Sequence, residues 1–239
     1  MTFRVGLALS LTVLAFAVLV KLGLWQLDRA AEKRTLMAQL EARAHQSLSW
    51  PPTHNDLAGY RLSLSGQTHP QNSLLLDNQT LDGQVGYRWL LPFEADKGGP
   101  WLLLDLGFVP VPRGSRALPE LPAVPDRLTV TGRLYRVGHN PLNHRLQAEP
   151  GPVTRIQALA FDALSQQWSQ SVLDAVLLVE QPSELGFARP WRPINLSPEK
   201  HQGYALQWFG LAVGLVLVVL AVLRRGRLQG PVKADRLET

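Results

Sequence analysis

Two apolar segments, one near each end, restrict the folds open to this chain of 239 residues more than any other feature. Residues 5–27 are apolar apart from a few side chains such as Lys21 and Gln26, and residues 204–223 carry no charge. A helix rises about 1.5 Å per residue, so about 20 apolar residues match a hydrocarbon layer of about 30 Å. We therefore predict a membrane protein with two transmembrane helices, residues 5–27 and 204–223, around one extramembrane domain, residues 28–203.

A cleaved signal peptide is the alternative for the first segment, because "MTFR" gives it a short positive start. The apolar run exceeds the usual length of a signal peptide core. Asp28 and Arg29 also stand where small residues should precede a cleavage site. These features favour a permanent anchor.

The positive charge of the chain lies at the membrane edges. Basic and acidic residues balance between positions 28 and 200, and the net charge of +5 comes from the flanks, most densely from "LRRGR" after the second apolar segment. A nucleic-acid binder would concentrate positive charge on the domain that touches phosphate. We therefore predict no nucleic-acid partner and take the lipid bilayer as the expected surroundings.

The same charges predict the orientation. Under the positive-inside rule, the N-terminus, residues 1–4, and the basic tail, residues 224–239, are cytoplasmic, and the domain is extracytoplasmic. Basic residues follow the first segment as well, but a long loop translocates largely regardless of its charge. Because no Arg/Ser-rich transit segment precedes the first span, we expect a bacterial inner membrane with the domain in the periplasm.

The chain contains no cysteine, which excludes disulfides, cysteine-ligated zinc, iron–sulfur clusters and thiol catalysis. With only Met1 and Met37, a thioether site for Cu(I) is also unsupported.

The pattern between the two spans predicts a stalk and then a β-rich domain. Residues 28–46 lack Gly and Pro and favour a helix that continues the first span until the prolines of "SLSWPPTHND" end it. From Tyr60 onward, short apolar or alternating runs are bounded by Gly, Pro, Asn and Asp, with a hairpin predicted at Asp82-Gly83. "IQALAFDALSQQW" has helical spacing, and "LDAVLLVEQP" resembles a last buried strand. We predict a mainly antiparallel β (α+β) domain, as a sheet or small barrel of consecutive strands.

Motifs of catalysis are lacking in the sequence. It contains no G-x-S-x-G, Walker glycine loop, G-x-G-x-x-G or H-E-x-x-H. His139 and His144 could chelate a metal from a loop, but no other ligand type is fixed near them, and histidines are common in turns.

The strongest candidate for binding lies at the foot of the second span. On a helix, His201, Tyr204 and Trp208 project from one face, together with Ala205 and Ala212, while Trp25 closes the first span. An aromatic belt at the headgroup level accounts for the aromatic side chains. The histidine leaves a second interpretation open, in which an imidazole above an apolar face holds a haem, which needs an axial donor and an apolar wall.

Two longer segments flank the predicted domain: "LGLWQLDRAAEKRTLMAQLEAR" at the end of the first apolar segment and "HQGYALQWFGLA" at the start of the second. Between them come, in this order, "GYRLSLSG", "LLLDNQT", "GYRWLLPF", "WLLLDLGFVP" and "LTVTGRLY". These segments and their order resemble the surfeit-locus family of cytochrome c oxidase biogenesis (assembly) proteins, and the two flanking segments resemble its entry and closing signatures.

The resemblance implies a non-catalytic inner-membrane assembly factor that helps insert haem a into the large catalytic subunit of a haem-copper oxidase. It implies His201 as the metal ligand, with Tyr204, Trp208 and Trp25 beside it in the cofactor site, and the haem a synthesis machinery as a further partner. Two alternatives stay open: a cofactor-free scaffold for an oxidase assembly intermediate, and an extracytoplasmic enzyme on a membrane tether.

Overall fold

The computed structural model of the chain describes residues 2–111, 118–137, 146–149, 151, 153–194 and 196–228. His139 and His144 lie outside the described residues. The chain divides into two compact units, Met1–Leu36 with Ile194–Thr239, and Met37–Pro193. We call them the helical unit and the barrel unit and describe each by itself.

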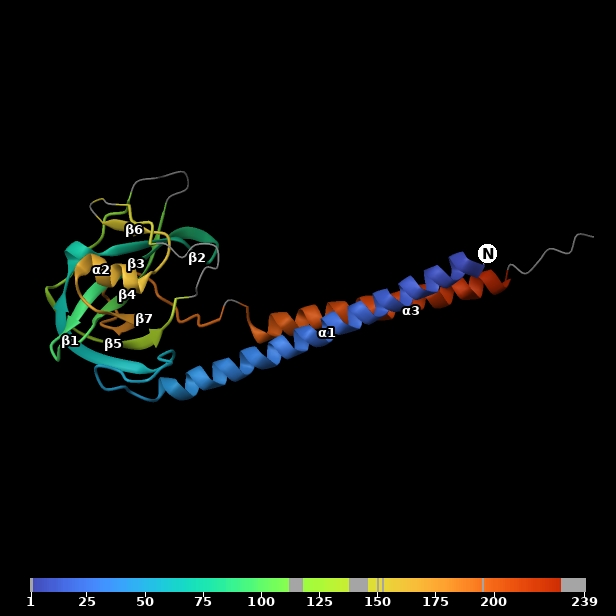
Figure 1. The fold of residues 1–239 in the computed structure, drawn as a ribbon, viewed down its shortest axis with the longest axis horizontal. Helices are drawn as coiled ribbons and strands as arrows, with labels where there is room; N and C mark the ends of the chain where they lie inside the picture. Colours follow the sequence, from blue (N-terminus) through green and yellow to red (C-terminus); the bar gives the residue numbers. More distant parts are fainter. Residues whose placement is uncertain are drawn as a thin grey trace, which may run out of the picture. The chain divides into compact units, whose positions relative to one another are not determined.

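The helical unit consists of most of α1 (Thr2–Ala44) and of α3 (Pro198–Leu228), which run side by side in opposite directions (Figure 1). Among the described residues these two helices are long and apolar enough to cross a membrane. At about 1.5 Å per residue, α1 is about 65 Å long, roughly twice the hydrocarbon thickness. Part of α1 therefore extends beyond the bilayer as a stalk.

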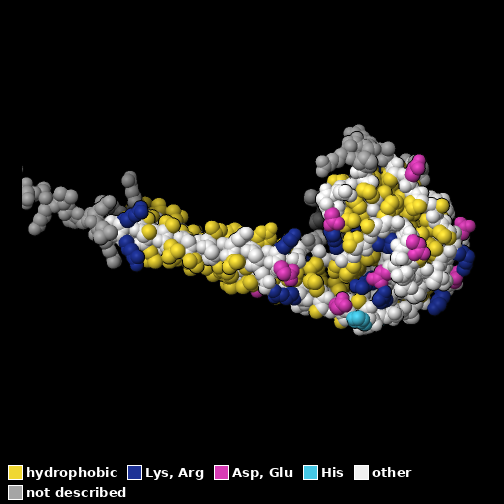
Figure 2. All heavy atoms as spheres, turned by 180° about the vertical axis from the view of Figure 1, so that it is seen from behind, with side chains coloured by type: hydrophobic (Ala, Val, Ile, Leu, Met, Phe, Trp, Pro, Cys, Tyr) yellow, Lys and Arg dark blue, Asp and Glu magenta, His cyan; other side chains and the backbone are white. Residues whose placement is uncertain are grey.

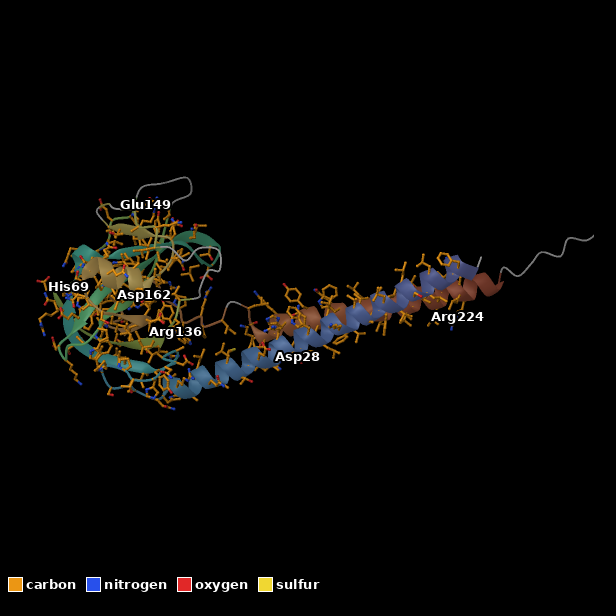
Figure 3. All side chains as sticks on the ribbon, viewed as in Figure 1. Asp28, His69, Arg136, Glu149, Asp162 and Arg224 are labelled. Carbon is orange, nitrogen blue, oxygen red and sulfur yellow. The ribbon has the colours of Figure 1, made fainter. Side chains whose placement is uncertain are left out.

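Hydrophobic side chains cover the outside of this helix pair between charged side chains at its two ends (Figure 2). Asp28 and Arg224 mark such charged positions on α1 and α3 (Figure 3). In a soluble protein this surface would be a large exposed apolar patch, which monomers rarely tolerate. The two-span membrane protein predicted from the sequence is confirmed as the fold class.

The barrel unit contains a seven-stranded sheet in its described residues. Its strands are β1 (Arg61–Thr68), β2 (Leu74–Leu81), β3 (Gln84–Ala95), β4 (Trp101–Pro110), β5 (Arg127–Tyr135), β6 (Thr154–Ile156) and β7 (Val172–Gln181). A 3₁₀ turn, η1 (Pro70–Asn72), precedes β2, and a short helix, α2 (Phe161–Trp168), precedes β7. The helix expected in "IQALAFDALSQQW" and the strand expected in "LDAVLLVEQP" are thus confirmed.

The strand order is β1-β5-β7-β4-β3-β2-β6, and β1 also pairs with β3 through Gly66 and Ala95. This second pairing closes β1, β5, β7, β4 and β3 into a barrel, with β2 and β6 as an extension. Most pairs are antiparallel, as predicted, while β4 with β7 and β2 with β6 are parallel. The strands do not simply follow one another, because β7 lies between β4 and β5.

The burial of β4 and β7 explains their central place. Leu102, Leu104 and Leu106 of β4 point into the barrel core, whereas Leu103 packs in a second apolar layer with Leu164 of α2. Successive side chains of a strand point to opposite faces, so a strand buried on both faces has an apolar residue at nearly every position. This is the pattern of "WLLLDLGFV" and "AVLLV".

The β2–β3 hairpin turns at Asp82 and Gly83, as predicted. Their φ angles are +50° and +79°, and two positive φ values in a two-residue loop define the turn that matches the twist of the flanking strands. Arg192 reaches back to this turn, with Nη2 2.8 Å from Asp82 Oδ1. The segment that leaves the barrel unit is thereby attached to the hairpin tip.

A buried polar cluster holds β3, β4 and β5 together. Asp105 is fully buried and forms an ion pair with Arg88, while its Oδ2 accepts a hydrogen bond of 2.6 Å from the hydroxyl of Tyr135. Its Oδ1 accepts the backbone N–H of Gly107 at 2.9 Å. Burial raises the pKa of Tyr135 well above its usual value, and the negative charge of Asp105 adds to that shift.

The sign of this shift gives a pH dependence. A phenol with a higher pKa in the folded protein than in the unfolded one contributes to the stability of the fold. The contribution is complete below the unfolded pKa of about 10 and is lost as the pH rises towards the folded pKa. We expect Tyr135→Phe to lower the free energy of unfolding by about 2 kcal/mol at neutral pH, because a hydrogen bond to a charged acceptor is lost. The advantage of the wild type should shrink above about pH 10.

Thermal unfolding of the detergent-solubilised protein, followed by near-ultraviolet circular dichroism between neutral and strongly alkaline pH, measures both effects. Tyr60→Phe is the matched control, because the partners of the Asp105 carboxylate among the described residues are Arg88, Gly107 and Tyr135. A constant difference between wild type and Tyr135→Phe across this pH range would contradict the role of the phenol.

Candidate functional site

The candidate site lies in the helical unit, where α3 begins. Ser197 precedes the helix, and its carbonyl accepts the backbone N–H groups of Lys200 and His201 at 3.1 and 3.4 Å. Pro198 occupies the first helical position, which suits proline because its φ is already helical and the missing N–H has no partner there. His201 therefore stands in the first turn of α3, at a well-defined helix start.

His201 is held against α1 by a polar contact. Its Nδ1 lies 2.7 Å from Oε1 of Gln26, and only 8% of the residue is exposed. An amide oxygen only accepts, so Nδ1 carries the proton that is donated in this bond. Among the described residues, this is the single hydrogen bond of the imidazole ring, and no partner bonds to Nε2.

The contact belongs to a regular seam between the two helices. The less exposed positions on α1 include 19, 23, 26 and 30, and those on α3 include 201, 205, 208 and 212. Spacings that alternate between three and four residues keep one face of each helix towards its neighbour, as in coiled coils. Gln26 and His201 are polar members of this seam.

Small residues at the seam make room for side chains of the opposite helix. A Cβ atom placed on Gly23 would lie 2.5 Å from Cε1 of Phe209, and Ala205 and Ala212 are almost fully buried. Small residues are typical of helix contacts in membranes, because they let the backbones approach. Gly23 is one turn from Gln26, so this close approach lies beside the polar contact.

The structure separates the aromatic residues that the sequence grouped with His201. Trp208 shares the seam face and is partly buried, whereas Tyr204 is 45% exposed. Trp25 is 47% exposed and lies under the guanidinium of Arg29, with Cζ 5.7 Å from the ring centroid. Tyr204 and Trp25 thus have the exposure expected of rings at a membrane interface.

The residue that the sequence reasoning missed is Gln26. In the sequence it is one of the few polar side chains of the first apolar segment, and it was not assigned to the site. The available signal was a polar side chain at seam spacing in the otherwise apolar stretch "LGLWQL". Its partner lies 175 positions away, so no local pattern joins the two.

The chemistry of the site fits an axial haem ligand better than a cage for a bare metal ion. The described residues contain no group of three or more His, Asp or Glu side chains that could hold a metal ion. A neutral imidazole that donates Nδ1–H to an oxygen is the usual form of a histidine that binds a metal through Nε2. A haem would bring its own four nitrogen ligands and needs a single such donor from the protein side.

Two candidate spans around a mixed β-barrel domain, with one histidine at the start of the second span, define a class of two-pass membrane protein. Residues 13–213 match the SURF1 family. The chain belongs to this family, which confirms the resemblance found in its sequence.

Relatives match over most of their length. A SURF1-like protein of Mycobacterium bovis is 28% identical over 246 residues, which cover 92% of this chain and 86% of the relative. A SURF1-like protein of Rickettsia felis is 22% identical, with 89% and 95% of the two chains covered. A SURF1-like protein of Rickettsia conorii is 21% identical, and the matched region covers 90% of this chain and 90% of the relative.

The seam predicts a strong effect at Gly23. We expect Gly23→Val to push α1 and α3 apart, since its Cβ would overlap the ring of Phe209, at a cost of about 1–3 kcal/mol for overpacking. Gly210→Val is the control, because a Cβ there meets no atom within 4 Å.

Spin labels at the exposed positions Leu24 and Leu211 report the separation of the helices by double electron–electron resonance. The distance should lengthen or broaden in Gly23→Val and stay unchanged in Gly210→Val. Equal distance distributions in both variants would show that the seam does not depend on Gly23.

Proposed function

We propose that this protein is an assembly factor for haem-copper cytochrome oxidase in a bacterial inner membrane, which holds haem a transiently through His201 and passes it to the large catalytic subunit. Membership of the SURF1 family supports the general role in oxidase assembly. The observation that carries the haem step is the hydrogen bond between His201 Nδ1 and Gln26, which leaves Nε2 available as an axial donor.

In this proposal haem a is cargo, and the chain supplies one imidazole. His201 Nε2 takes one axial position of the iron, and the opposite position stays open for a ligand from the receiving subunit. Trp208 and the apolar outer faces of the helices offer a wall for the macrocycle. A single protein ligand gives moderate affinity, which a carrier needs because its cargo must leave.

The position of His201 at the edge of the second apolar segment also suits haem a as cargo. His201 begins α3, just before the apolar stretch from Tyr204 onward, so a haem bound there keeps its apolar ring in contact with lipid-facing side chains. The haem a synthesis machinery, as the donor, and the large catalytic subunit, as the acceptor, are both proposed partners.

The proposed orientation places residues 1–4 and 224–239 in the cytoplasm and the barrel unit in the periplasm. Its support is the basic cluster that follows the second apolar segment, including Arg224 and Arg225.

A cofactor-free scaffold is the second candidate, and one observation favours it. Fixing the register of two membrane helices is a sufficient role for a glutamine–histidine hydrogen bond, as it is for buried polar pairs in coiled coils. In that case the barrel unit binds an oxidase intermediate and His201 holds nothing. The two candidates differ in whether the protein binds haem, with His201 as the ligand in the first candidate alone.

Haem binding by the detergent-purified protein separates them. With haem a added, we expect a Soret band from a histidine-bound haem, and His201→Ala should weaken binding by more than about 100-fold, beyond the 10–100-fold typical of losing an outer-shell partner. His54→Ala is the matched control, because this exposed histidine lies in the barrel unit. Equal binding by wild type and His201→Ala would remove the ligand assignment. A wild type that binds no haem but still forms a complex with the oxidase subunit would favour the scaffold.

The absence of cysteine makes the orientation easy to test. We expect Lys97→Cys, in the barrel unit, to react with a membrane-impermeant maleimide in intact spheroplasts. Arg225→Cys should react only after lysis. Labelling of Arg225→Cys in intact spheroplasts, with Lys97→Cys protected, would reverse the proposed orientation.

A further inference from the structure

Gln26 is unusual for its place in the chain. It is the polar side chain of "LGLWQL", a stretch of α1 between Lys21 and Asp28, and it lies on the face that meets α3. Its Oε1 is 2.7 Å from Nδ1 of His201. A polar group in apolar surroundings is costly without a partner, so this hydrogen bond accounts for the side chain's direction.

The bond also decides where the imidazole keeps its proton. A neutral imidazole has one N–H and one lone pair, and the two ring nitrogens compete for the proton. Because Oε1 can only accept, it stabilises the tautomer with the proton on Nδ1. The lone pair then lies on Nε2.

The helix seam holds the two partners in place. Gly23, one turn away on α1, permits the close approach to Phe209 of α3, and Ala205 is almost fully buried one turn beyond His201. His201 is 8% exposed as a residue, and its ring is hydrogen-bonded through Nδ1, so rotation of the ring is limited. An imidazole oriented before the ligand arrives loses less freedom on binding.

We propose that Gln26 is a positioning residue for the haem ligand, which selects the Nδ1–H tautomer of His201 and directs the lone pair of Nε2 to the iron. This inference rests on the proposed function, in which His201 binds haem. Gln26 itself touches no haem. Its hydrogen bond also increases the donor strength of the imidazole, as oxygen partners of metal-binding histidines generally do.

The tautomer is measured without haem. Protein labelled with ¹⁵N-histidine and kept at alkaline pH, so that its imidazole rings are neutral, gives separate long-range couplings for the two tautomers. The His201 signal is identified by its loss in His201→Ala. We expect Nδ1–H in the wild type, and Nε2–H or an averaged signal in Gln26→Leu, which has no acceptor.

Haem binding gives the second measurement. We expect Gln26→Leu to raise the dissociation constant for haem a by about 10–100-fold, the usual effect of losing an outer-shell partner, with a shifted Soret band. Gln26→Glu keeps an acceptor in the same place and should retain the tautomer and the binding. Gln207→Leu, an exposed glutamine on α3, is the matched control for removing an amide from the helical unit. Circular dichroism and the spin-label distance identify any variant that loses the helix pair.

The outcomes separate this inference from the function beneath it. If His201→Ala abolishes haem binding while Gln26→Leu keeps both the tautomer and the affinity of the wild type, Gln26 has no positioning role and the proposed function stands. If His201→Ala binds haem normally, the proposed function fails. In that case the inferred effect of Gln26 on haem fails with it, even where Gln26→Leu changes the tautomer. A changed tautomer and weakened binding in Gln26→Leu, both rescued in Gln26→Glu, support the proposal.

Discussion

The hydrogen bond between Gln26 and His201 is the contact on which the arrangement of the helical unit depends. The rest of the seam is small or apolar, and in lipid such surfaces attract each other no more strongly than they attract acyl chains. Packing of Phe209 against Gly23 already favours one register of α1 and α3. The polar pair adds a second constraint, because sliding by one turn would leave both an amide and an imidazole without partners in apolar surroundings. The same bond therefore helps to fix the register of the helices and sets the direction of His201.

The barrel unit is built on a different constraint. β4 and β7 are buried on both faces: one face of each strand lines the barrel interior, and the other face packs in the apolar layer that includes Leu164 of α2. Both strands therefore form the centre of the sheet. The ion pair of Arg88 with Asp105 lies within this apolar setting and is completed by the hydroxyl of Tyr135. A buried carboxylate with three partners is satisfied, whereas the loss of one partner leaves a charge exposed to a low dielectric. The polar cluster thus specifies how β3, β4 and β5 meet.

Local patterns in the sequence were enough to predict the elements but not their long-range partners. The apolar runs, the end of α1 before the prolines, the turn at Asp82-Gly83 and the helix near Phe161 all follow from neighbouring residues. The closure of β1 on β3 and the insertion of β7 beside β4 depend on pairings between distant segments, which periodicity does not encode. Gln26 was missed for the same reason. Helical spacing also placed Tyr204 on the same face as His201, but Tyr204 is exposed in the structure. A residue at the edge of a helix face can point away from the neighbouring helix, and the spacing alone does not show where that helix lies.

The difference between a carrier and a scaffold can be argued from what the seam requires. To fix register alone, the bond could run in either direction, since an amide presents both an oxygen and an NH₂ group. In the structure Oε1 is the amide atom that faces Nδ1, and an accepting oxygen favours the tautomer that binds metals through Nε2. A contact that only fixes register is served equally well by either tautomer. The carrier proposal therefore gives the orientation of the amide a role, which the scaffold proposal does not.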